Sequence, residues 1–178
     1  MRSSTTAIAL VVERDGKRVR FFTRNGHLRT DRYSLIVEVA LRNRSSLFAI
    51  DGEAVQLGGD GVSDCNGLHS LRHDDEVQLY ASDVMELDGD DLRKLPLTMR
   101  KTNPARLLAR RRDGIYIAPF ETGEIGPDLF RKACKFGFEG LVSKRRDSHY
   151  RPGRPPSWIK VKNRAAHPAM EMVKEAFS

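Results

Sequence analysis

Two lysines near the end of the chain, Lys160 and Lys162, alternate with the apolar residues Ile159 and Val161. Successive side chains of a β-strand point to opposite faces, so a strand here places both lysines and Trp158 on one face. Two ammonium groups side by side on a strand with an apolar back suit an anionic ligand. The pattern therefore indicates binding of a phosphate-bearing molecule.

These lysines belong to a basic stretch, residues 138–163. Two runs with strand character, residues 139–144 and 158–162, flank a loop rich in Pro, Gly and Arg, which favours a long hairpin. Its basic residues are Lys144, Arg145, Arg146, Arg151, Arg154, Lys160 and Lys162. Against them stand Glu139 and Asp147, so the stretch carries most of the formal net charge of +7. Composition alone fits a solvated hairpin without a ligand equally well.

The elements that must position these groups are mostly strands. A hairpin opens the chain, because residues 7–13 form an apolar, β-branched run, Asp15-Gly16 is a strong turn signal and residues 17–23 alternate between apolar and basic side chains. Residues 46–51 and 53–57 are predicted as two strands with Asp51-Gly52 as the turn between them. Residues 76–84 form a further strand, and residues 128–136 a helix that leads into the basic stretch.

Length and composition bound the class of protein. The 178 residues allow one domain or a sizeable piece of a larger protein. An isoelectric point near 9.7 favours nucleic acid or nucleotide as partner. Cys65 and Cys134 lack close spacing, which favours a reduced compartment, and the sequence has no apolar run of about 18 residues. We therefore expect a cytoplasmic monomer that does not associate with membranes.

Three motifs in this order resemble those of ATP-dependent DNA ligases, especially the bacterial end-joining type. Glu139-Gly140-Leu141-Val142-Ser143-Lys144 followed by Trp158-Ile159-Lys160-Val161-Lys162 is similar to the last two nucleotidyltransferase motifs, and Asp51-Gly52-Glu53 to an earlier one. The resemblance covers about residues 8–168. It implies an α+β fold of two packed antiparallel β-sheets with flanking helices, similar to ATP-grasp folds. Residues 1–168 would be a partial nucleotidyltransferase domain, and residues 169–178 a polar tail.

The resemblance also implies roles for individual residues. The residues that would bind the nucleotide are Arg24, Glu53, Glu139, Lys160 and Lys162. Glu53 and Glu139 would also hold Mg²⁺, the divalent metal that acts with ATP. Lys144 lies on the opposite strand face from Glu139, so we assign it to DNA phosphate together with the loop arginines Arg145, Arg146, Arg151 and Arg154.

Three departures from the family pattern bear on activity. The family begins its site with Lys-x-Asp-Gly, and here the corresponding residues 4–7 are Ser-Thr-Thr-Ala, with no lysine before Lys17. Ser82 stands where the family commonly has an aromatic residue that stacks on adenine. We also expect the chain to stop before the oligonucleotide-binding (OB) domain. The interpretation is an N-terminally truncated adenylation domain without its nucleophile.

Three functions remain open from the sequence. The first is an ATP-binding ligase domain that acts on nicked or broken double-stranded DNA, with a separate polypeptide supplying the missing motif or OB domain. The second is a catalytically dead remnant that binds nucleotide or nucleic acid through the basic loop. The third is a non-functional gene fragment. We expect no self-adenylation in any of the three.

Overall fold

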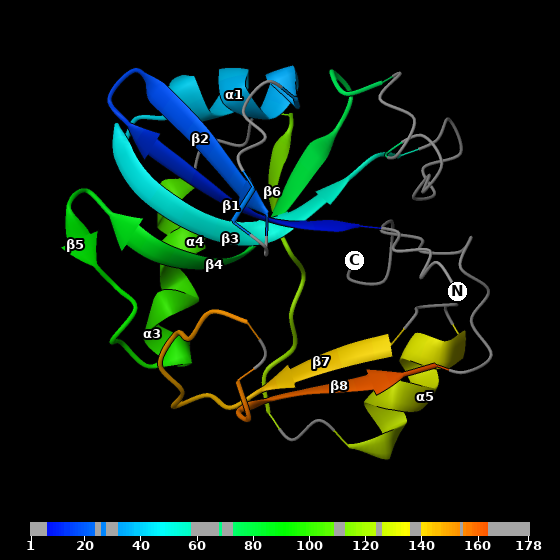
Figure 1. Cartoon of the computed structure of the whole chain (residues 1–178). Helices are drawn as coiled ribbons and strands as arrows, with labels where there is room; N and C mark the ends of the chain where they lie inside the picture. Colours follow the sequence, from blue (N-terminus) through cyan, green and yellow to red (C-terminus); the bar gives the residue numbers. More distant parts are fainter. Residues whose placement is uncertain are drawn as a thin grey trace.

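A computed structural model describes residues 7–23, 26–27, 32–57, 68, 73–108, 113–123, 126–135, 140–153 and 155–163. In Figure 1 a large sheet occupies the middle of the molecule, with helix α1 on one side of it and a small two-stranded sheet on the other. The predicted α+β fold with two sheets and flanking helices is confirmed.

The large sheet contains β1 (Ile8–Asp15), β2 (Arg18–Thr23), β3 (Leu47–Val55), β4 (Gln78–Leu87), β5 (Asp90–Asp91) and β6 (Ile115–Ile117). Its order is β2-β1-β3-β4-β5, and these neighbours are antiparallel. β6 differs from the expected antiparallel sheet, because it pairs with β4 in parallel. The reason is the intervening helical segment, which returns the chain to the starting end of β4, as parallel pairing requires.

The predicted opening hairpin is confirmed, with Asp15 opposite Arg18 and Gly16 at a φ of 60° in the turn. The predicted turn at Asp51-Gly52 is wrong, because β3 runs through both residues. A Cβ on Gly52 would lie 2.6 Å from the backbone oxygen of Tyr80. This glycine therefore serves a close approach between β3 and β4 rather than a chain reversal.

One face of the large sheet packs on α1 (Ser34–Leu41) and forms the core. Leu10, Ile50 and Leu79 of the sheet and Ile36 of the helix are almost completely buried there. Arg14 is buried at the same face and donates hydrogen bonds of 2.8 Å from Nη1 to the carbonyl oxygens of residues 40, 43 and 45. One guanidinium thus satisfies carbonyls at the end of α1.

The remaining helices pack along β4 and against the small sheet. Helices α3 (Leu97–Arg100) and α4 (Thr102–Leu107) pack along β4, and α5 (Pro127–Lys135) contacts the small sheet. The predicted helix 128–136 is confirmed through residue 135, and residue 136 is outside the described part of the chain. The small sheet pairs β7 (Gly140–Lys144) with β8 (Trp158–Lys162) in antiparallel register, as the predicted long hairpin requires.

Within the described ranges, no helix combines the length and the apolar character that a membrane crossing needs. The predicted boundary at residue 168 and the tail 169–178 are outside the described residues.

Candidate functional site

The face of the small sheet that carries Trp158, Lys160 and Lys162 is confirmed by the register of β7 and β8. Lys162 is opposite Gly140, Lys160 opposite Val142 and Trp158 opposite Lys144. Lys144 therefore shares this face, and its ammonium nitrogen lies 3.9 Å from the centroid of the Trp158 ring. Three lysines stand on one surface, which we call the lysine face.

Figure 1 shows the small sheet across from the large sheet, and Lys144 of the lysine face interacts with Asp83 and Asp51 of the large sheet. Burial lowers the pKa of Lys144, while the nearby carboxylates of Asp83 and Asp51 act in the opposite direction. Asp51 and Glu53 of β3 lie on the second face of the large sheet, because Ile50 and Ala54, which alternate with them, are in the core. Cations of one sheet thus meet carboxylates of the other.

Two β-bulges in β4 turn extra side chains toward the small sheet. The pairing shifts so that Asp51 is opposite Asp83 while Gly52 is opposite Ala81, which leaves Ser82 without a partner strand residue. A second shift skips Met85. The first bulge is the reason that Asp83 leaves the regular alternation and faces Asp51.

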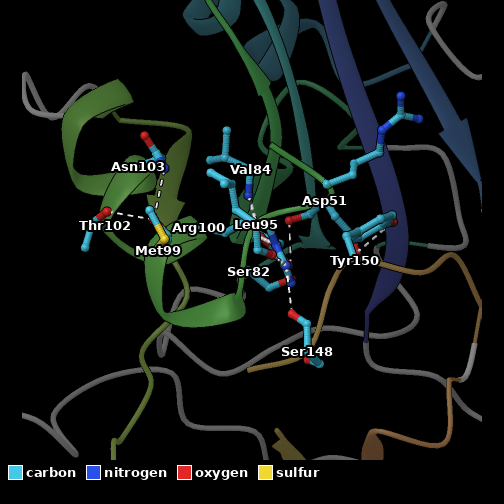
Figure 2. Close-up of polar contacts among 12 residues, drawn as sticks. Asp51, Ser82, Val84, Leu95, Met99, Arg100, Thr102, Asn103, Ser148 and Tyr150 are labelled. Carbon is cyan, nitrogen blue, oxygen red and sulfur yellow. Dashed lines mark hydrogen bonds and ion pairs between the residues drawn. The ribbon is translucent and has the colours of Figure 1, made fainter. Parts of the chain in front are cut away.

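Asp83 forms a completely buried ion pair with Arg100 of α3. Both side chains are 0% exposed, and Arg100 Nε and Nη2 each donate to an Asp83 oxygen at 3.0 Å. Arg100 Nη1 also donates to the carbonyl oxygens of Leu95 and Ser148, the latter at 2.9 Å (Figure 2). Arg100 therefore connects β4, the start of α3 and the loop after β7.

Asp51 lies next to this ion pair and receives a 3.4 Å hydrogen bond from the Tyr150 hydroxyl (Figure 2). Burial raises the pKa of Asp51 to about 6, although the ammonium of Lys144 opposes the shift. Burial, and then the carboxylate of Asp51, raise the pKa of Tyr150. The tyrosine therefore stays protonated as a donor over the physiological range.

Lys101 follows Arg100 and belongs to the same cluster. Burial lowers its pKa to about 8, and the ammonium of Lys144 adds to the shift. Its nitrogen lies 4.5 Å from the centroid of the Phe120 ring. Two partly desolvated amines, Lys101 and Lys144, thus stand near the carboxylates of the large sheet.

Backbone hydrogen bonds join the basic loop between β7 and β8 to α3 and to the segment that precedes it. The Thr98 N–H donates to the carbonyl oxygen of Arg146 at 3.1 Å, and the Tyr150 N–H to that of Arg93 at 2.8 Å. The loop encloses a hollow of about 350 Å³. Residues lining it include Arg145, Asp147, His149, Arg151, Pro155 and Ser157. These bonds hold the described backbone of the loop in place while the side chains of Arg145, Arg146 and Arg151 remain exposed.

The predicted site residues that the structure describes fall into three groups. Glu53, Lys160 and Lys162 are exposed on the two facing surfaces. Lys144 lies on the lysine face, apart from the loop arginines with which the sequence grouped it. Arg145, Arg146 and Arg151 are in the loop. Arg24, Glu139 and Arg154 are outside the described residues, as are residues 4–6.

A metal site is not resolved among the described residues, where no group of three or more His, Cys, Asp or Glu side chains is close enough to hold an ion. Glu53 is the described member of the predicted Mg²⁺ pair. Gly140, which follows Glu139, approaches β8 so closely that a Cβ would lie 2.1 Å from the backbone oxygen of Val161. The glycine of this motif is therefore required by strand packing.

Sequence reasoning did not identify the cluster formed by Asp83, Arg100, Lys101 and Tyr150. These residues are far apart in the chain, and their types are common in loops and on surfaces. Ser82 lies in the first bulge of β4, and its hydroxyl donates to the backbone oxygen of Asp51 at 3.3 Å. It offers no ring to a ligand.

Comparison with known families finds one match that covers most of the chain. The model for the ATP dependent DNA ligase domain matches residues 9–162. A probable DNA ligase of Streptomyces coelicolor is 35% identical over 170 residues, which cover 87% of this chain and 33% of that protein. The multifunctional non-homologous end joining protein LigD of Mycobacterium bovis is 33% identical over 157 residues, which cover 86% of this chain and 20% of the relative.

Solved structures give the same result. The ligase domain of LigD from M. tuberculosis superposes with a TM-score of 0.73 at 31% identity, over 87% of this chain and 50% of that one. A mycobacterial DNA ligase D complexed with ATP and MES has a TM-score of 0.74 at 31% identity, over 87% of this chain and 51% of the other. The chain thus spans about half or less of each of these proteins.

Proposed function

Because this chain belongs to the ATP-dependent DNA ligase family, we propose that it binds ATP between its two sheets and takes part in joining DNA strands during end-joining repair. The observation that carries the proposal is the lysine face opposite the carboxylates Asp51 and Glu53. A triphosphate needs cations, and a sugar or a bound Mg²⁺ needs acceptor oxygens. The lysine face supplies the cations, and Asp51 and Glu53 supply the acceptor oxygens.

The residues present fit an ATP–Mg²⁺ complex as follows. Lys160 and Lys162 are exposed on the lysine face, where their ammonium groups would neutralise the α-phosphate. Glu53 is exposed on the opposite surface, where it can accept from the ribose or ligate Mg²⁺. Glu139 would be the second metal ligand. Mg²⁺ would neutralise charge on the transferring phosphate, and the lysines would hold that phosphate in position.

The direct test is calorimetric titration of the protein with ATP in the presence of Mg²⁺. We expect weak binding, because Lys160, Lys162 and Glu53 are present while Ser82 contributes no stacking. Replacing both lysines by Gln should abolish measurable binding, since two charge-assisted contacts are lost. Binding that survives the double replacement would place the nucleotide elsewhere.

A Ser82→Phe replacement is expected to tighten ATP binding severalfold. An aromatic contact contributes about 0.5 to 1.5 kcal/mol, and residue 82 is unpaired in the bulge, so a ring can extend from it without breaking a strand pair. The measurement is the calorimetric dissociation constant, with Ser82→Leu as the control for apolar volume. An unchanged constant for the Phe variant would show that the base does not stack at residue 82.

For DNA, we propose that the loop between β7 and β8 contacts the phosphate backbone. Replacing Arg145, Arg146, Arg151 and Arg154 by Ser should weaken binding of nicked duplex. It should also flatten the salt dependence by about one counterion per lost phosphate contact. The measurement is fluorescence anisotropy of labelled duplex at several salt concentrations.

The matched control removes the same charge from other elements. It replaces the exposed residues Lys17, Arg18, Arg44 and Arg106 by Ser. We expect this control to keep the salt slope of the unmodified protein. Equal losses in both variants would show that net charge, and not the loop, governs DNA binding.

The second candidate function is a nucleic-acid-binding remnant without catalysis. It is favoured by one observation, the absence of lysine at residues 4–7. Nicked-duplex binding with a steep salt slope but no ATP binding would support it. We propose further that a separate polypeptide supplies the nucleophile if this chain takes part in strand joining.

A further inference from the structure

Four residues on the second face of the large sheet form a row across four strands. Ala9 of β1 is opposite Glu53 of β3, Glu53 is opposite Tyr80 of β4, and Tyr80 is opposite Tyr116 of β6. The neighbours of the two tyrosines, Leu79 and Ile115, belong to the core on the other face. The tyrosines therefore face the same side as Glu53.

Tyr80 and Tyr116 form a stacked aromatic pair. Their ring centroids are 5.5 Å apart and their planes are inclined by 26°, while both residues remain partly exposed. The Tyr116 hydroxyl donates to Asp113 at 3.3 Å, which orients its ring. Burial raises the pKa of both phenols, so the rings are neutral at physiological pH. Stacking against Tyr116 therefore holds the Tyr80 ring in position, so that a partly exposed aromatic surface is formed before any ligand binds.

We propose that this pair is the surface on which the base of a bound nucleotide stacks, with its sugar toward Glu53; this rests on the proposed function. Adjacent strands are about 4.8 Å apart, so a base against Tyr80 brings its ribose to the neighbouring strand that carries Glu53. The phosphates then extend toward the lysine face. In this arrangement the base contacts aromatic rings, the sugar hydroxyls contact a carboxylate and the phosphates contact ammonium groups.

The same geometry relates Tyr80 to Ser82. Ser82 follows Tyr80 by two residues in β4, with the core residue Ala81 between them. Because this protein has no aromatic ring at residue 82, the base can stack instead on the ring of Tyr80, two residues earlier in β4. Tyr80 would determine base binding in place of Ser82.

The test compares calorimetric dissociation constants for ATP and for inorganic tripolyphosphate, both with Mg²⁺. Tyr80→Leu should weaken ATP binding by about three- to tenfold and leave tripolyphosphate binding unchanged, because only ATP carries a base. Tyr80→Phe, which keeps the ring, should bind ATP within about twofold of the unmodified protein. Adding Ser82→Phe to Tyr80→Leu should restore the lost affinity.

Two controls accompany these variants. Phe22→Leu removes a partly exposed aromatic residue from β2, outside the row, and should change neither constant. Tyr116→Leu leaves Tyr80 in place and should reproduce part of the loss if Tyr80 fails to tolerate leucine. Circular dichroism verifies that each variant is folded.

The outcomes separate this proposal from the one on which it rests. If the unmodified protein binds neither ATP nor tripolyphosphate, the proposed function fails and this inference fails with it. If it binds ATP and Tyr80→Leu binds ATP equally well, only this inference is overturned. Weakened binding of nicked duplex by Tyr80→Leu with unchanged ATP binding would overturn it in favour of a DNA base.

Discussion

After incubation with α-labelled ATP and Mg²⁺, this chain is expected to remain unlabelled on a denaturing gel. Self-adenylation requires an amine that attacks the α-phosphate, so that a P–N bond forms as pyrophosphate leaves. Residues 4–7 are Ser-Thr-Thr-Ala, and the first lysine of the sequence is Lys17, in the turn between β1 and β2. A Ser or Thr hydroxyl without an activating base is a poor nucleophile.

Other lysines near the facing surfaces are not expected to substitute. Lys101 and Lys144 have lowered pKa values, which increases their reactive amine fraction, but each nitrogen lies over an aromatic ring. Lys160 and Lys162 are placed to neutralise a phosphate, which differs from in-line attack opposite the leaving group. A labelled band that mass spectrometry maps to any lysine of this chain would refute the expectation.

The converse experiment restores the family motif. The combination of Ser4→Lys, Thr6→Asp and Ala7→Gly is expected to yield a labelled band, because it restores the family's Lys-x-Asp-Gly sequence just before β1, and Ala9 near the start of that strand pairs with Glu53 of β3. A control with Ser4→Arg, Thr6→Asp and Ala7→Gly carries the same charge without the nucleophile and should stay unlabelled. Equal labelling of both would contradict the role of residue 4.

Replacement of Arg100 by Met is expected to destabilise the protein by about 3 to 5 kcal/mol, because it leaves the Asp83 carboxylate buried and uncompensated. Both side chains are 0% exposed, so solvent cannot take over the lost hydrogen bonds. The effect is a large fraction of the roughly 5 to 15 kcal/mol typical of a domain. The measurement is the midpoint of urea unfolding followed by circular dichroism.

Two further variants make that prediction specific. Arg93→Met removes an exposed ion pair with Asp91 and should leave the unfolding midpoint unchanged. Combining Arg100→Met with Asp83→Leu removes both charges and should recover much of the stability lost by Arg100→Met alone. If the double variant were as unstable as Arg100→Met, the cause would be lost packing and not the uncompensated charge.

Local pattern was sufficient for the elements whose residues are neighbours in the sequence. The alternation of Lys160 and Lys162 with Ile159 and Val161 predicted the lysine face, because a two-residue period follows directly from strand geometry. The opening hairpin followed from Asp15-Gly16 in the same way. The order of the motifs along the chain also indicated the ligase family, which the family model confirms.

Asp51-Gly52-Glu53 shows where local pattern failed. The dipeptide Asp-Gly is typical of turns, yet β3 continues through it because Gly52 lies against the backbone of Tyr80 in the neighbouring strand. The competing requirement was a close approach between two strands. The residues next to Gly52 in the sequence do not reveal this close approach, because it depends on Tyr80 in another strand.

The residue types, the motif order and the faces of β8 were thus determined by the sequence alone. Tertiary structure decided that Lys144 joins the lysine face and that Asp83 pairs with Arg100, 17 residues away. It also decided that Tyr80 stacks on Tyr116. The physical reason is that bulges, strand order and desolvation arise when distant segments pack, so the contacts and pKa values of these groups depend on neighbours that no local spacing specifies.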